Sequence, residues 1–170
     1  MGKLIELKTS ENTRKEVIKV NIKLAKAILF LLVEGNEPIY KTKLNKLLFY
    51  AQFLYAKRYG GNLIGKEFIK DFYGPAIEDL DYELKMLCRQ NLIELNNNGY
   101  GTIIYPKARF KDENYTCRER EVLQTVIERF RGFTASDITE QSHTEPLWID
   151  GEMKQVIPLN QANKLIEFIR

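Results

Sequence analysis

The densest apolar stretch of the chain lies at residues 43–59 and reads KLNKLLFYAQFLYAKRY. Its apolar residues recur at the spacing of one helical face: Leu44, Leu47, Leu48, Ala51, Leu54 and Tyr55. Phe49 and Phe53 cover much of the opposite side, so the predicted helix is apolar around most of its circumference. Thr42 suits its N-cap and Gly60 its C-terminal stop. Such a helix is expected at the centre of a fold.

An amphipathic helix is predicted before this central one, over residues 12–34. Asn12 or Thr13 suits its N-cap, Glu16 is placed for a capping box, and Gly35 suits its end. Its lysines line another side of the helix and are most simply interpreted as a solvated face.

An extended segment, a helix and a hairpin are predicted after the central helix. Residues 66–73 indicate a short extended segment that ends at a turn formed by Gly74 and Pro75. Pro75 then opens a helix that reaches Gln90. The acidic residues near its start are better explained by their favourable interaction with the helix dipole than by a metal site. Within residues 92–105, two apolar runs flank an Asn-Gly turn, which predicts a β-hairpin.

Further helices are predicted in the C-terminal part of the chain. Thr116 caps a helix that reaches about Arg131, and Thr134 opens a shorter one that ends near Ser142. Residues 158–170 are expected to form a last amphipathic helix.

Together these elements predict a mainly α (α+β) fold, a compact helical domain with a small β-hairpin, in which residues 1–170 form a single domain. The helix over 75–90, followed at once by the hairpin, has a winged-helix-like local order. A DNA-reading helix would carry exposed basic or amide side chains. This one carries four acids against Lys85 and Arg89, and the tip of the hairpin has no basic residue. We therefore expect a structural or protein-binding wing.

Composition restricts the class of protein. The 170 residues carry 26 basic and 23 acidic side chains, and the net charge of +3 does not require a nucleic-acid partner. Two cysteines are too few for a disulfide framework, and no signal peptide or bilayer-spanning stretch is readable, so we expect a cytoplasmic protein without a membrane partner. No phosphate loop, HExxH, GxSxG or spaced set of metal ligands is present. The expectation is a protein that is not an enzyme and uses no cofactor or metal.

The single histidine, His143, and the single tryptophan, Trp148, lie close together in the sequence. No nucleophile adjoins His143, so we expect its ring to bond a backbone carbonyl or to pack against an aromatic side chain. Trp148 is either an interface anchor or a core residue, and the sequence leaves both open.

Three motifs occur in order along the chain: KLNKLLFYAQ at residues 43–52, YGP at 73–75 and SHTEPLW at 142–148. Together they resemble the SocA-like, or Panacea, antitoxin domain, a prophage-associated family. The resemblance covers about residues 40–150, which we take as the antitoxin core.

This resemblance implies an antitoxin that binds a cognate toxin and neutralises it by direct contact within a toxin–antitoxin system. It leaves the toxin's chemistry open, because the family pairs with many unrelated toxins. The signature positions carried over as partner-binding residues are Lys46, Tyr50, Gln52, Tyr73, Gly74, Pro75, His143 and Trp148. Lys46, Tyr50 and Trp148 are expected to anchor the partner, and alanine at Tyr50 or Trp148 is expected to weaken binding without loss of helix. The family often has a tryptophan before Tyr-Gly-Pro, where this chain has Asp71 and Phe72.

Other functions stay open from the sequence. They are a winged-helix-like DNA-binding transcriptional regulator that uses the basic N-terminal third, a protease adaptor, and a phage anti-defence protein. Homo-oligomer formation also stays open.

Overall fold

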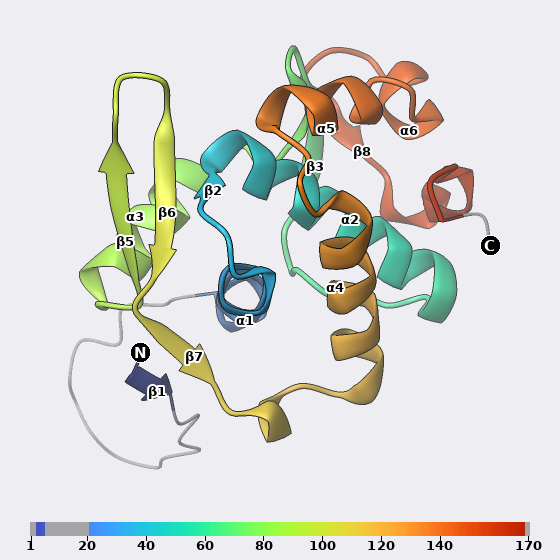
Figure 1. Ribbon diagram of the computed structural model, residues 1–170. Coiled ribbons are helices and arrows are strands. Elements are labelled where there is room, and N and C mark those ends of the chain that lie inside the picture. Colours follow the sequence, from blue (N-terminus) through green and yellow to red (C-terminus); the bar gives the residue numbers. More distant parts are fainter. Residues whose placement is uncertain (1–2, 6–20, 169–170) are drawn as a thin grey trace.

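The structure, a computed structural model, describes residues 3–5 and 21–168. It is a mixed α+β fold that is mainly helical, as the sequence predicts. Helices surround one long central helix, and a β-hairpin stands at one side of this helical body (Figure 1). Within the described ranges, no helix is both long and apolar enough to cross a membrane.

The central helix is α2 (Lys41–Tyr59), which confirms the prediction for residues 43–59. Its buried side chains point in every direction around the axis, and they include Leu44, Leu47, Leu48, Phe49, Tyr50, Phe53 and Leu54. The N-cap is Tyr40 rather than Thr42, and no side chain caps the helix. Gly60 ends α2 in the left-handed conformation expected of glycine (φ 74°).

Helix α1 (Ile22–Gly35) precedes the central helix and packs against it. The helix begins later than predicted, because Asn21 is its N-cap and accepts a hydrogen bond from the amide of Leu24. The predicted start at Asn12 or Thr13 lies outside the described residues. At the other end, Asn36 adopts a left-handed conformation (φ 50°), which terminates α1 close to the predicted position.

Two helices from the C-terminal half cover another side of α2. Helix α4 (Cys117–Phe130) begins at Thr116, and helix α5 (Ala135–Ser142) begins at Thr134, so both predicted N-caps are confirmed. Each threonine accepts a hydrogen bond from the third residue of its helix, whose carboxylate accepts one in return from the threonine amide.

The predicted hairpin consists of β5 (Ile93–Asn97) and β6 (Thr102–Pro106) and follows helix α3 (Leu80–Arg89). A third strand, β2 (Ile39–Tyr40), pairs antiparallel with β6 and gives the order β2-β6-β5. The sequence did not indicate β2, because two residues are too few for a periodic pattern. The winged-helix-like assignment stays a prediction.

A second sheet has the order β4-β3-β8 and joins distant parts of the chain. Strands β3 (Phe68–Asp71) and β4 (Gly74–Ala76) form a hairpin, and β8 (Val156–Ile157) pairs with the other edge of β3. This arrangement corrects the prediction that Gly74 and Pro75 form the turn and that Pro75 opens a helix. Both residues belong to β4, where an edge strand tolerates the missing amide of proline.

The remaining elements are short. Strand β7 (Ala108–Phe110) pairs in parallel with β1 (Lys3–Ile5), and a 3-10 turn (Asp112–Asn114) leads into α4. Helix α6 (Pro146–Ile149) follows α5. The predicted C-terminal α-helix is wrong for the described residues, because Leu159–Lys164 form a 3-10 helix, η2, that packs on α2.

Candidate protein-binding site

The residues singled out from the sequence lie around the β3–β4 hairpin. They come from α2 (Lys46, Tyr50 and Gln52), from the hairpin (Tyr73, Gly74 and Pro75) and from the α5–α6 region (His143 and Trp148). Their exposure differs sharply. Tyr73 is exposed, and His143 and Trp148 are half-buried, whereas the three α2 residues, Gly74 and Pro75 are buried.

Lys46 lies beneath strand β4. Its side chain is only 2% exposed, and its ammonium donates a hydrogen bond to the carbonyl oxygen of Pro75 at 3.1 Å. Burial lowers the pKa of Lys46 to about 8, although the Asp71 carboxylate opposes this shift. Lys46 therefore supports the hairpin from inside, and its role in binding a partner stays a prediction.

Gly74 is required by the close approach of the hairpin to α2 and α5. A Cβ atom at this position would lie 2.7 Å from both Lys46 Cε and Ser142 Oγ. The backbone φ of 104° is also one that other residues rarely adopt. A glycine is therefore the residue type that lets β4 lie directly against these side chains.

Trp148 connects helix α6 to strand β3. Its indole nitrogen donates a hydrogen bond to the Asp71 carbonyl at 2.9 Å. One neighbour of the ring is His143, which stacks on it at 4.3 Å between centroids, and another is the Lys70 ammonium, 4.5 Å from the ring centre. The prediction that His143 packs against an aromatic side chain is confirmed. Burial and the nearby Lys46 charge lower the pKa of His143, which favours a neutral ring.

Tyr50 is fully buried, which corrects the expectation that it contacts a partner. Its ring packs against Phe49 and Phe130, with centroids 5.1 and 4.7 Å away. The hydroxyl lies toward the buried Glu145 carboxylate but makes no hydrogen bond of good geometry. Glu145 accepts hydrogen bonds from the amides of Ile166 and Glu167 and so holds the C-terminal segment.

Gln52 is also an internal support. Its side-chain oxygen accepts hydrogen bonds from the amides of Leu63 and Ile64, and its nitrogen donates to Asn62. These three bonds shape the loop between α2 and β3. The helical periodicity of α2 gave no indication of this role, because it does not show which loop folds back on the helix.

The exposed part of the site is aromatic. Phe72 and Tyr73 form the turn of the β3–β4 hairpin, each is 69% exposed, and their rings meet edge to face at 5.3 Å. Ile149 and Met153 are exposed in segments that bond to strand β3. The carbonyl of Ile149 accepts a hydrogen bond from the Lys70 ammonium, and the amide of Lys154, which follows Met153, donates one to the Lys70 carbonyl. We call Phe72, Tyr73, Trp148, Ile149 and Met153 the hairpin-tip patch. Two adjacent aromatic residues before a Gly-Pro pair were the sequence signal for it.

Comparison with known proteins identifies the family. Residues 44–149 match the model of the SocA-like antitoxin Panacea domain, which is well over half of the chain. This protein is a member of the SocA-like Panacea family. Neither a curated protein nor a solved structure matched the chain.

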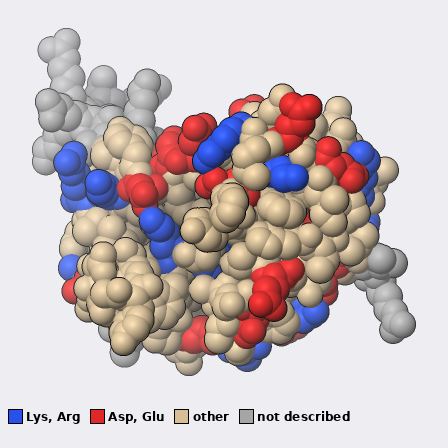
Figure 2. Space-filling model, turned by 90° about the horizontal axis from the view of Figure 1, so that it is seen from above, with Lys and Arg blue, Asp and Glu red and all other residues tan. Residues whose placement is uncertain are grey.

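The Panacea match contains most of α2, the β3–β4 hairpin and Trp148, so every residue of the hairpin-tip patch except Met153 lies in the family region. It ends before β8, the strand that completes the sheet beside the patch. Figure 2 views the end of the molecule where the hairpin turn, α5 and α6 lie, and shows a broad uncharged area with charged groups scattered around it. Large uncharged surfaces of this kind are typical of protein interfaces.

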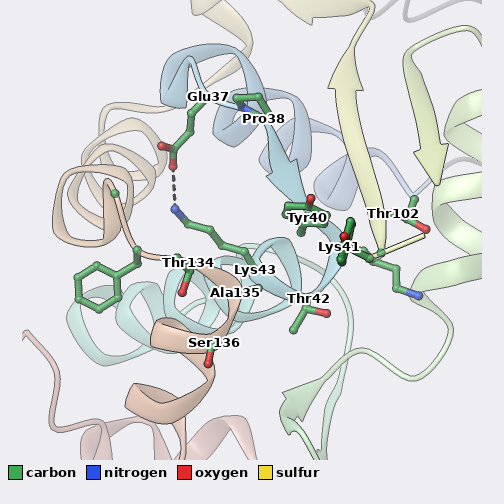
Figure 3. A pocket seen from close by; sticks show the side chains of 14 residues that line it. Glu37, Pro38, Tyr40, Lys41, Thr42, Lys43, Thr102, Thr134, Ala135 and Ser136 are labelled. Carbon is green, nitrogen blue, oxygen red and sulfur yellow. Dashed lines mark hydrogen bonds and ion pairs between the residues drawn. The ribbon is translucent and has the colours of Figure 1, made fainter. Parts of the chain in front are cut away.

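Two cavities border the N-terminal half of α2. One, of about 600 Å³, lies between the start of α2, the tip of the β5–β6 hairpin and the α4–α5 connection. Figure 3 shows the ion pair of Lys43 with Glu37 on its wall, with a nitrogen–oxygen distance of 2.7 Å. The other cavity, of about 310 Å³, lies between α2 and the β3–β4 hairpin and includes Lys46 and Tyr73 in its lining. Within residues 3–5 and 21–168, no group of three or more histidine, cysteine or acidic side chains could hold a metal ion.

Proposed function

We propose that this protein is an antitoxin that neutralises a toxin protein by direct contact through the hairpin-tip patch. Membership of the Panacea family supports the antitoxin role and a non-catalytic one. The observation that supports the surface is the aromatic pair Phe72 and Tyr73, because two large aromatic rings on a turn are costly to expose without a partner.

The patch has the support that an interface needs. Lys46 holds β4 from below, and Trp148 holds β3 from the side, so both strands of the hairpin are fixed before a partner arrives. A preorganised surface loses little conformational entropy on binding. The acidic residues at and just before the start of α3, Glu78, Asp79, Asp81 and Glu83, do not favour DNA contact through this helix, since phosphates would repel them.

The test begins with the open reading frame next to this one. Its product, expressed alone in the cytoplasm, is expected to arrest growth, and co-expression of this protein is expected to restore growth and to co-purify with it. Phe72→Ala and Tyr73→Ala are expected to weaken the complex at least about tenfold each. Tyr100→Ala is the matched control, because Tyr100 is 93% exposed at the tip of the other hairpin.

The same experiment separates the other functions. Growth arrest without complex formation contradicts direct neutralisation. A complex in which the toxin's half-life becomes shorter identifies a protease adaptor, whereas an unchanged half-life with restored growth supports the proposal. Equal weakening by Tyr100→Ala would place the contact elsewhere.

A further inference from the structure

Among the described residues, Lys46 differs from the other buried lysine, Lys43, in forming no ion pair with a carboxylate. Lys43, one turn earlier on the same helix, is equally buried but pairs with Glu37 at 2.7 Å and also donates to the Phe130 carbonyl. In the described part of the chain, the ammonium of Lys46 makes one hydrogen bond, to the Pro75 carbonyl. An ammonium group has three donors, so two remain unused. A buried charge in this state is costly unless something pairs with it.

The cavity of about 310 Å³ gives this ammonium an opening to the surface. Asn45 lies beside Lys46 in its lining, and its side-chain oxygen accepts a hydrogen bond from the Ile77 amide at 3.0 Å. That bond fixes the orientation of the amide, and the Asn45 nitrogen has no partner among residues 3–5 and 21–168. Tyr73 also lines the cavity, so it adjoins the hairpin-tip patch.

Among the described residues that line this cavity, Lys46 is the lysine without an ion pair, although the Asp71 carboxylate is near enough to favour its charge. Lys41 pairs with Asp81, and Lys154 pairs with Asp71, each at 2.7 Å. Glu78, which is exposed, also lines the cavity and disfavours an incoming anion. The donors of Lys46 nevertheless belong to a buried side chain, and water screens a charge least where it is buried.

We propose that this cavity receives an acidic side chain, aspartate or glutamate, of the bound toxin, held by the Lys46 ammonium and the Asn45 amide. The inference rests on the proposed function, since it describes a contact beside the hairpin-tip patch. The carboxylate gains a charge-assisted hydrogen bond and supplies the partner that Lys46 lacks. A cavity of this size accommodates one side chain, and its place beside Tyr73 lets one toxin surface reach both features.

The first test uses the free protein and acetate as the probe. NMR titration of the Lys46 side chain is expected to give a pKa that rises by about one unit as acetate is added, because a bound carboxylate favours the charged amine. Asn45→Ala is expected to reduce this rise. Lys43 is the internal control and is expected to show no change, because Glu37 already pairs with it. A Lys46 pKa that does not respond to acetate overturns the inference.

The second test uses the toxin found in the growth experiment. Lys46→Met keeps most of the side-chain volume and is expected to weaken the complex by about 10- to 100-fold. One Asp→Asn or Glu→Gln variant of the toxin is expected to weaken it similarly, and Lys46→Met is expected to add little to that variant. Equal toxin binding by wild type and Lys46→Met overturns the inference but leaves the proposed function intact. If no toxin binds the wild-type protein, the proposed function fails and the acetate titration still decides whether the cavity binds a carboxylate.

Discussion

The indole nitrogen of Trp148 and the carbonyl oxygen of Asp71 are joined by a hydrogen bond of 2.9 Å across 77 positions of the chain. This bond fastens α6 to the strand that leads into the Phe72–Tyr73 turn. Trp148 supports the hairpin and is half-buried, whereas its role as an interface anchor stays a prediction.

Replacement of Trp148 by phenylalanine tests this support. Phe keeps an aromatic ring for His143 to stack on but removes the hydrogen bond to Asp71, so we expect a loss of about 1–2 kcal/mol in the free energy of unfolding. Urea denaturation followed by far-UV circular dichroism measures it. An unchanged stability would show that the bond contributes nothing to the hairpin.

Gly74→Ala is expected to be far more damaging than Gly99→Ala. Both glycines have positive φ, 104° and 86°, but a Cβ at Gly99 would meet nothing within 4 Å, whereas one at Gly74 would collide with Lys46 and Ser142. Gly99→Ala should cost only the backbone strain of about 1–2 kcal/mol. Thermal unfolding of the two variants separates strain from collision, and equal losses would contradict the tight packing of β4.

Substitutions of Tyr50 should separate its ring from its hydroxyl. Tyr50→Ala removes a fully buried ring and is expected to cost about 3–5 kcal/mol, in contrast to the expectation from the sequence that the fold would be unaffected. Tyr50→Phe is expected to be nearly neutral, because the hydroxyl lacks a well-formed hydrogen bond. Chemical denaturation of both variants measures the two losses in the free energy of unfolding. A Tyr50→Phe variant as unstable as Tyr50→Ala would show that the hydroxyl contributes to stability.

The lowered pKa of Lys46 predicts a pH dependence of stability. The unfolded chain holds the proton up to its ordinary pKa of 10.5, whereas the folded protein releases it near 8, so stability rises with pH between these values. At about 1.4 kcal/mol per unit, wild type should gain on the order of 3 kcal/mol relative to Lys46→Met between pH 8 and 10.5. Denaturation of both proteins across this range measures the difference and cancels other titrating groups. A constant difference would contradict the shift.

The helical part of the fold was readable from the sequence because its signals are local. The apolar residues of α2 and the caps Thr116 and Thr134 each act within a few positions of the chain. The β4-β3-β8 sheet was not readable, since β8 joins β3 from more than 80 residues away. The sequence does not show that Gly74 and Pro75 pair with β3, and it therefore predicts a turn at these two residues.

The candidate site was only partly predictable for a related reason. The motifs located the right segments, but α2 is apolar nearly all round, so periodicity could not show that Tyr50, Gln52 and Lys46 point inward. Phe72 was noted only as a departure from the family pattern, although it is among the most exposed aromatic side chains described. Burial of this kind depends on which distant segment covers a position, and that is a tertiary property.

Strand β8 joins the C-terminal part of the chain to β3, the strand that leads into the Phe72–Tyr73 turn. A force on the C-terminus would act first on the bonds of Ile166 and Glu167 to Glu145 and on η2, and next on the short strand that borders β3. Strand β8 consists of two residues, so few bonds would join it to β3 once η2 had detached. The strand that carries the aromatic turn would then lose this neighbour while the packing of α2 against α1, α4 and α5 was still intact.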